Sequence, residues 1–185
     1  MAKKIIILAS GNGSNAENIT RFFQDSDHIR VHSVLCNRKK AKIFDRFEKY
    51  ATPCLWFDAS SPGAVVDYCQ KYPPDLIVLA GYLKKIPPEL IALFPNKIIN
   101  IHPALLPAYG GKGMYGMHVH NAVYKAKESF SGISIHYVNE QYDDGAIIFQ
   151  EKVELTPTDT PDLIAQKIQA LEYTHYPLII RRLLT

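Results

Sequence analysis

Short apolar runs alternate with amphipathic segments along the first hundred residues of the chain. Runs without polar alternation are typical of strands covered on both faces of a parallel sheet, and the longer segments between them have helical spacing. The pattern predicts an α/β fold, a three-layer, doubly wound, mostly parallel sheet between helices. The predicted strands are 4–9, 31–36, 54–57, 75–80 and 97–100, and the predicted helices are 14–24, 40–50, 63–71 and 87–95.

The last third of the chain has a different pattern. Residues 131–138 alternate apolar and polar positions, and a turn at 142–145 leads into a second strand at 146–155. Together they predict an antiparallel C-terminal strand pair. Helices are expected at 118–127 and after Thr160, where a hydroxyl cap precedes a proline and an acid. No linker or repeat interrupts the pattern, so we expect residues 1–185 to form a single domain.

Composition excludes several classes of protein. The three cysteines are isolated, which argues against a disulfide framework and fits a reducing compartment. The apolar run after Lys4 is too short for a signal peptide or a membrane span, so we expect a cytoplasmic protein with no membrane contact. The net charge of +3 is not gathered into one basic stripe, and we expect no nucleic-acid partner.

The stretch Asn-Ile-His-Pro-Ala-Leu-Leu-Pro at 100–107 follows the last apolar run and is the first candidate for chemistry. Side chains alternate in an extended segment, so Asn100 and His102 should point to the same side. Pro103 and Pro107 disfavour helix before them and predict a rigid extended loop. An amide beside an imidazole suits a developing oxyanion in acyl transfer. The pattern alone leaves equally open that the pair only ties down the loop.

Two further observations bear on the acyl-transfer hypothesis: acids lie in a later turn, and residues 100–107 contain no nucleophile. Asp143 and Asp144 lie in the later turn, and a carboxylate near His102 would raise the pKa of that imidazole. Residues 100–107 contain no serine or cysteine. Direct attack by a substrate amine is therefore a simpler scheme than a covalent acyl-enzyme.

A glycine turn follows the first predicted strand, with the sequence Ser-Gly-Asn-Gly-Ser-Asn at 10–15. A turn that opens a helix presents backbone N–H groups and the positive end of the helix dipole, which favour a phosphate. It could equally be a plain turn in which Ser14 or Asn15 caps the helix. Like Asn100 and His102, the turn lies at a strand's carboxyl end, where doubly wound sheets bind ligands.

Two further features carry weaker signals. The glycine-rich segment 108–117 suggests a lid over a site, or a surface loop without a role. His118 and His120 form an H-x-H pair, but histidines at this spacing diverge on a helix and no cysteine or carboxylate set accompanies them. We therefore expect no metal.

Four stretches in this order resemble the folate-dependent phosphoribosylglycinamide formyltransferases: residues 10–15, 79–82, 100–107 and 143–145. The resemblance covers nearly the whole chain and implies the formyltransferase fold. It implies transfer of the formyl group of the co-substrate 10-formyltetrahydrofolate to the amine of 5'-phosphoribosylglycinamide in de novo purine biosynthesis, by direct amine attack through a tetrahedral intermediate. It also implies small-molecule substrates only, and a monomer or homodimer.

The resemblance assigns roles to individual positions. It implies that Asn100, His102 and Asp143 are catalytic, and that Glu172 holds the ribonucleotide substrate. The implied phosphate-binding residues are Gly13, Ser14 and Asn15, and the implied folate-binding residues are Leu83, Lys84, Lys85 and Ile86 together with Asp143.

The chain departs from the family pattern at some positions. Asp144 replaces a small residue, so either acid of the turn could act, and Lys84 replaces an arginine. The segment between Pro107 and His118 is longer, and the chain ends at Thr185 without the C-terminal extension of many members.

Two other hypotheses stay open. The methionyl-tRNA or sugar-nucleotide formyltransferases share the proline motif but normally carry a further C-terminal domain. A non-catalytic nucleotide-binding module would use only the glycine turn.

Overall fold

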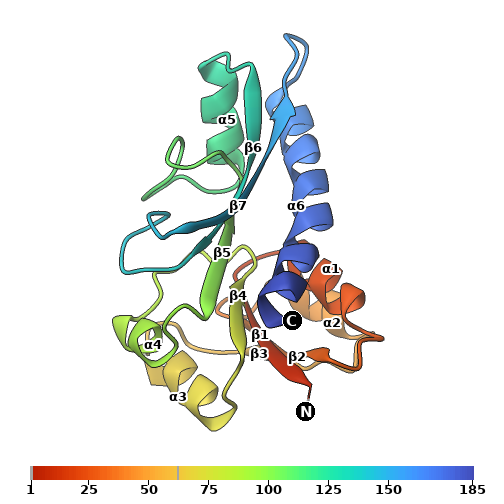
Figure 1. The fold of residues 1–185 in the computed structure, drawn as a ribbon, viewed down its shortest axis with the longest axis vertical. Coiled ribbons are helices and arrows are strands. Elements are labelled where there is room, and N and C mark those ends of the chain that lie inside the picture. Colours follow the sequence, from red (N-terminus) through yellow and green to blue (C-terminus); the bar gives the residue numbers. More distant parts are fainter. Residues whose placement is uncertain (1, 62) are drawn as a thin grey trace. The chain divides into compact units, whose positions relative to one another are not determined.

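The computed structural model describes residues 2–61 and 63–185, and within them the strands form one seven-stranded sheet in the order β3-β2-β1-β4-β5-β6-β7 (Figure 1). The chain divides into two units, residues 1–99 with 180–185 and residues 100–179. The strands are β1 Lys3–Ala9, β2 Ile29–Cys36, β3 Cys54–Trp56, β4 Leu76–Leu79, β5 Ile98–His102, β6 Phe130–Tyr137 and β7 Ile147–Glu154. The helices are α1 Ser14–Phe22, α2 Ile43–Phe47, α3 Gly63–Lys71, α4 Pro88–Leu93, α5 Met117–Lys125 and α6 Pro161–Leu184.

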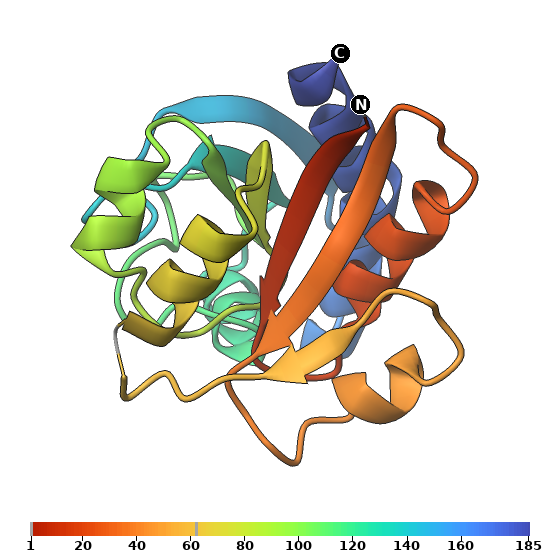
Figure 2. The ribbon, with the colours of Figure 1, turned by 90° about the horizontal axis from the view of Figure 1, so that it is seen from below.

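The first unit has the predicted parallel arrangement. Strand β1 pairs in parallel with β2 and β4, and β2 pairs in parallel with β3. Helices α1 and α2 lie on one face of these strands, and α3 and α4 lie on the other (Figure 2). Because both faces of β1 are covered, its residues 5–8 have no exposed surface, which explains the unbroken apolar run in the sequence.

Several predicted boundaries differ from the observed ones by one residue or more, and two of the differences have a clear physical reason. The helix predicted at 40–50 is only the five-residue α2, in which Ile43 and Phe47 are the buried pair one turn apart. The charged residues around them gain no burial from further helix. The strand predicted at 97–100 extends to His102, because Pro103 is the first residue that lacks the N–H needed to continue it.

The second unit contains the predicted antiparallel pair. Strands β6 and β7 pair from Phe130 opposite Glu154 to His136 opposite Ile147, with an irregularity before His136. The alternating residues Ser134 and His136 of β6 have exposed fractions of only 0% and 2%, so the polar face of this strand is buried. The predicted cap is confirmed, since the Thr160 hydroxyl accepts a hydrogen bond from the Leu163 amide at 3.3 Å.

The Ser134 hydroxyl anchors the proline-bounded segment to this strand pair. It donates to the Ala104 carbonyl at 2.7 Å and accepts from the Leu106 amide at 2.9 Å and from Gln150 Nε2 at 2.7 Å. A hydroxyl has one donor and two acceptor positions, so its capacity is fully used. The same Gln150 amide donates to the Leu106 carbonyl at 3.0 Å. The rigidity predicted from two prolines therefore has a second source in buried hydrogen bonds.

Two other expectations concern the chain as a whole. No helix within residues 2–61 and 63–185 is long and apolar enough to cross a membrane. The single domain predicted for residues 1–185 stays a prediction.

We predict that Gly132→Ala will destabilise the fold strongly. A Cβ at position 132 would lie 2.2 Å from the Glu151 carbonyl oxygen and 2.5 Å from Leu105 Cδ2, and a backbone oxygen in a paired strand cannot easily retreat. We expect a loss of about 3 kcal/mol in the free energy of unfolding, at the upper end of overpacking effects, measured by urea denaturation. Gly63→Ala is the matched control, because its Cβ would meet only Asp67 Oδ2 at 3.6 Å. Equal stability of the two variants would contradict the prediction.

Candidate functional site

The carboxylate of Asp143 brings the predicted catalytic residues together within the second unit. Its Oδ1 accepts a hydrogen bond from Asn100 Nδ2 at 3.4 Å, and its Oδ2 lies 3.5 Å from His102 Nδ1. Asn100 and His102 therefore point to the same side of β5, as alternation predicted. Ile101 between them is 7% exposed and belongs to the core.

The structure distinguishes the two acids of the turn. Asp143 is half-buried and contacts both Asn100 and His102. Asp144 is exposed, and its Oδ2 accepts a hydrogen bond from Asn139 Nδ2 at 3.3 Å. The geometry therefore places Asp143, and not Asp144, beside the imidazole.

Both nitrogens of His102 face hydrogen-bond acceptors. Nε2 lies 2.8 Å from the Tyr109 carbonyl oxygen, which can only accept, so Nε2 carries a proton. Nδ1 faces the carboxylate of Asp143. These contacts favour the imidazolium, as we expected from the sequence. Burial nevertheless lowers the pKa of His102 below its ordinary value, because desolvation of this 3% exposed residue outweighs the charge of Asp143 and the Tyr109 carbonyl. The carboxylate acts on the pKa in the expected direction, but burial, which the sequence did not indicate, reverses the net shift.

Asp143 is held in an unusual backbone conformation. Its φ of 53° lies in the left-handed region, which is uncommon for residues other than glycine. The Gly111 amide donates to Oδ2 at 2.9 Å and so joins the turn to the glycine-rich segment. Burial alone would raise the pKa of Asp143, but hydrogen bonding by His136, the charge of His102 and the Gly111 amide together lower it. Asp143 is therefore ionised at neutral pH.

His136 is a site residue that the sequence reading missed. Its Nδ1 donates to the Tyr137 carbonyl at 2.8 Å, which leaves Nε2 facing the site. Nε2 lies 3.2 Å from Asn100 Nδ2 and 3.6 Å from Asp143 Oδ1. The signal was present in the alternation of 131–138, but we expected its polar positions to form a separate face of the strand rather than the floor of a site.

The segment between Pro107 and α5 also has an anchor that does not involve Asp143. The Tyr109 hydroxyl donates to Glu128 Oε1 at 2.6 Å, and this hydrogen bond raises the pKa of Tyr109 to about 12. At the end of the segment His118 is exposed whereas His120 is buried, so the two histidines diverge as predicted. Within the described residues, 2–61 and 63–185, no group of three or more His, Cys, Asp or Glu side chains could hold a metal ion.

The glycine turn forms the start of α1 in the first unit. Gly13 is the N-cap residue in a left-handed conformation, with φ 72° and ψ 18°, and makes no side-chain cap hydrogen bond. Ser14 and Asn15, which the plain-turn alternative offered as caps, lie inside the helix instead. A left-handed residue followed by helical ones turns successive N–H groups toward one point, a concavity that binds anions. This conformation is consistent with the predicted phosphate-binding role of residues 13–15.

The segment expected to bind folate lies beside the glycine turn in the same unit. The Ser10 hydroxyl accepts a hydrogen bond from the Leu83 amide at 2.9 Å, and the Ser10 amide donates to the Gly81 carbonyl at 3.1 Å. Leu83, Lys84 and Lys85 are exposed, whereas Ile86 is buried.

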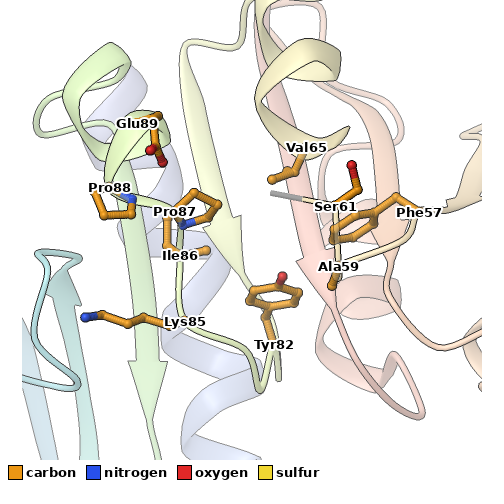
Figure 3. Close-up of a pocket in the computed structure, with 10 residues that line it drawn as sticks. All are labelled: Phe57, Ala59, Ser61, Val65, Tyr82, Lys85, Ile86, Pro87, Pro88 and Glu89. Carbon is orange, nitrogen blue, oxygen red and sulfur yellow. The ribbon is translucent and has the colours of Figure 1, made fainter. Parts of the chain in front are cut away.

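A cavity of about 310 Å³ opens next to this segment (Figure 3). The rings of Phe57 and Tyr82 line it and stack at 6.2 Å between centroids. Ile86 lies on its wall, and Lys85 also lines it but extends its amine away from the two rings (Figure 3). Two of the five predicted folate-binding residues, Lys85 and Ile86, therefore border a largely apolar cavity.

Glu172, the predicted ribonucleotide ligand, lies in α6 one turn before Tyr176. The Tyr176 side chain is fully buried. Burial first, and then the charge of Glu172, raise the pKa of Tyr176 well above its ordinary value. Glu172 itself is only partly exposed.

Known proteins resemble the chain over nearly its whole length. The family model described as formyl transferase matches residues 3–180. The phosphoribosylglycinamide formyltransferase of Bacillus subtilis is 36% identical over 190 residues, which cover 98% of this chain and 95% of the relative. The chloroplastic phosphoribosylglycinamide formyltransferase of Arabidopsis thaliana is 40% identical over 187 residues, which cover 96% of this chain and 64% of the relative.

Solved structures agree with these relatives. Glycinamide ribonucleotide transformylase 1 from Geobacillus kaustophilus superimposes with a TM-score of 0.90 at 32% identity and covers all of both chains. The phosphoribosylglycinamide formyltransferase from Bacillus halodurans gives a TM-score of 0.89 at 34% identity, covering 99% of this chain and 96% of that one.

We predict that Asp143→Asn will lower the pKa of His102 further, because the substitution removes the anion that favours the imidazolium. A nearby opposite charge typically contributes about 1 or more to a pKa, which nuclear magnetic resonance titration of the imidazole can resolve. Asp144→Asn is the matched control and should leave the pKa unchanged, since Asp144 contacts Asn139 instead. An equal fall in both variants would show that Asp143 is not the specific partner.

Proposed function

Because the chain belongs to the formyl transferase family, we propose that it transfers the formyl group of 10-formyltetrahydrofolate to the amine of 5'-phosphoribosylglycinamide in de novo purine biosynthesis. The named relatives support this substrate. The observation that carries the chemistry is the convergence of Asn100 and His102 on the carboxylate of Asp143. An amide, an imidazole and an ionised acid within hydrogen-bonding reach suit formyl transfer to an amine.

The proposed reaction proceeds through one tetrahedral intermediate. The unprotonated amine nitrogen attacks the formyl carbon, a C–N bond forms, and the carbonyl oxygen becomes an oxyanion. Asp143 takes the proton from the attacking nitrogen, directly or through water, and passes it to the folate nitrogen. The C–N bond to the folate then breaks, leaving formylated product and tetrahydrofolate. Holding both substrates in line supplies part of the rate acceleration.

We propose that Asn100 and His102 donate hydrogen bonds to the oxyanion. In the structure both donors contact protein acceptors: Nε2–H of His102 faces the Tyr109 carbonyl, and Nδ2 of Asn100 donates to Asp143 Oδ1. An oxyanion must therefore replace the Tyr109 carbonyl at His102. At His102 an oxyanion competes well against the neutral carbonyl, because hydrogen bonds to ionised acceptors are about twice as strong as neutral ones. Asn100 Nδ2 carries two hydrogens, so it can keep its hydrogen bond to the ionised Asp143 while the other hydrogen is donated to the oxyanion. Such replacement favours the transition state over the unliganded site.

The lowered pKa of His102 bears on its role. Burial favours the neutral imidazole in the unliganded protein, whereas a developing oxyanion adds a negative charge nearby and favours the imidazolium. We propose that the developing oxyanion raises the pKa of His102, and that the imidazole takes up a proton from solvent as the oxyanion forms and returns it when the intermediate collapses. This would give stabilisation that increases along the reaction, which is the condition for raising the rate of the chemical step.

We propose that substrate binding uses the other predicted residues. Gly13, Ser14 and Asn15 would bind the phosphate, supported by the left-handed Gly13 at the start of α1. Glu172 would bind the ribonucleotide through its carboxylate. Leu83–Ile86 and the turn of Asp143 would contact the folate, and the cavity beside Lys85 and Ile86 offers apolar surface for an aromatic part of that molecule.

The kinetic test compares variants of the two acids and the histidine. We expect His102→Ala and Asp143→Asn to lower kcat about 100-fold or more, since oxyanion donors and acid–base groups each contribute on that scale. KM for 5'-phosphoribosylglycinamide should change little. Asp144→Asn should retain kcat within about twofold, because it alters a charge in the same turn without contacting the imidazole. Near-wild-type turnover in His102→Ala or Asp143→Asn would overturn the proposal.

Thermal unfolding with each ligand separates the transferase from a module that binds only a nucleotide. We expect both 5'-phosphoribosylglycinamide and a non-reactive folate analogue to raise Tm. Each ligand at 100 times its Kd adds about 2.7 kcal/mol of stability, which corresponds to roughly 5–10 °C for a chain of this size. Stabilisation by the phosphorylated ligand alone would favour a binding module and contradict the transferase.

A further inference from the structure

We propose that Arg46 is a positioning residue that fixes the direction of the Gly13 amide in the glycine turn, and thereby the affinity for the substrate phosphate. This inference rests on the proposed phosphate-binding role of residues 13–15. Arg46 lies in α2, and its Nε donates to the Asn12 carbonyl at 2.9 Å. Its guanidinium is engaged by the Asn12 carbonyl and by Glu17, so it is not itself expected to touch the ligand.

A single hydrogen bond to Asn12 sets the orientation of a whole peptide group. The peptide unit is planar and trans, so the Gly13 N–H points opposite to the Asn12 carbonyl. While Arg46 holds that carbonyl, the N–H must point away from Arg46, and the Gly13 amide is available to the anion-binding concavity. A flipped Asn12–Gly13 peptide would direct a carbonyl oxygen there and repel a phosphate.

The turn needs this restraint because Gly13 has wide conformational freedom. Glycine reaches both left-handed and right-handed conformations at little cost, so the residue that makes the turn accessible does not by itself select one orientation. Ile43, also in α2, supplies a second restraint. An ideal Cβ on Gly13 would lie 2.2 Å from Ile43 Cγ1, so this side chain packs directly against the Gly13 backbone.

Arg46 is itself held by the acid of α1. One of its terminal nitrogens pairs with Glu17 Oε2, while Nε reaches Asn12, so the planar guanidinium bridges the helix and the turn before it. Glu17 Oε1 also contacts Lys49 Nζ at 2.8 Å and the Tyr50 hydroxyl at 3.0 Å. Although burial alone would raise the pKa of Glu17, hydrogen bonds from Lys49, Arg46 and Tyr50 lower it to about 2. Glu17, which holds Arg46, is therefore ionised throughout the physiological pH range.

Lys49 offers a matched control for charge. Arg46 and Lys49 both pair with Glu17, so Arg46→Met and Lys49→Met each remove one positive charge from the same carboxylate. Arg46 in addition donates a hydrogen bond to the Asn12 carbonyl, whereas the contact described for Lys49 is with Glu17. A difference between the two variants thus reports on the orientation of the turn rather than on the loss of a cation.

Steady-state kinetics tests the substrate effect. We expect Arg46→Met to raise KM for 5'-phosphoribosylglycinamide about tenfold, the scale of one charge-assisted hydrogen bond, while kcat stays within about twofold and KM for the folate is unchanged. Competitive inhibition by inorganic phosphate should weaken by a similar factor. Lys49→Met should match the wild type within about twofold in every constant. An unchanged KM in Arg46→Met, or an equal rise in both variants, would overturn the inference.

Hydrogen–deuterium exchange of the ligand-free protein tests the restraint independently of activity. Peptides covering residues 12–16 should exchange faster in Arg46→Met than in Lys49→Met and the wild type, and equal exchange in all three would also overturn the inference. A wild type that neither turns over nor responds to phosphate would overturn the proposed function instead. Should Arg46→Met fail to fold, Arg46→Lys keeps the cation but lacks the planar fork, and an intermediate rise in KM is expected.

Discussion

The half-buried carboxylate of Asp143 is the group on which the rest of the second unit's site depends. Removing a carboxylate from water is costly unless charges and hydrogen bonds replace its hydration. Here Oδ2 has the Gly111 amide and His102, and Oδ1 has Asn100 and His136. Segments distant in the sequence are therefore tied to one side chain, and the orientation of each partner is defined by the same anion.

Two opposing effects act on the protonation of His102, and their balance determines how the site responds to charge. Burial disfavours a charged imidazole, whereas Asp143 and the Tyr109 carbonyl favour it. Because desolvation dominates, the proton affinity of His102 is sensitive to water access and to any negative charge that forms beside it. A site arranged in this way responds to the charge of the reacting group more strongly than an exposed histidine would.

Periodicity was sufficient to predict much of this arrangement. The strand β1, the helix α3 at 63–71 and the antiparallel pair β6–β7 follow from local patterns, and the alternation of Asn100 and His102 follows from strand geometry. The choice between Asp143 and Asp144 required the fold, because adjacent residues in a turn have no fixed direction until tertiary contacts set one.

Other features depend on burial or on contacts between distant residues. His136 has the pattern of a polar strand position, and only packing of both faces of β6 shows that it is buried beside Asp143. The lowered pKa of His102 results from desolvation, which no local pattern encodes. The bridge from Arg46 to Asn12 joins residues 34 positions apart, with no repeat or motif to indicate it.

The packing of Ile43 against Gly13 limits which sequences this fold can accept. A larger residue at position 13 would clash with the side chain of Ile43, and its own backbone would be strained, because φ is 72°. Shortening residue 43 removes the clash and leaves the strain. A change at position 43 therefore compensates only in part for a substitution at position 13, whereas position 43 can vary toward smaller residues at the cost of a cavity. Among related sequences we therefore expect smaller residues at position 43 without a matching larger residue at position 13.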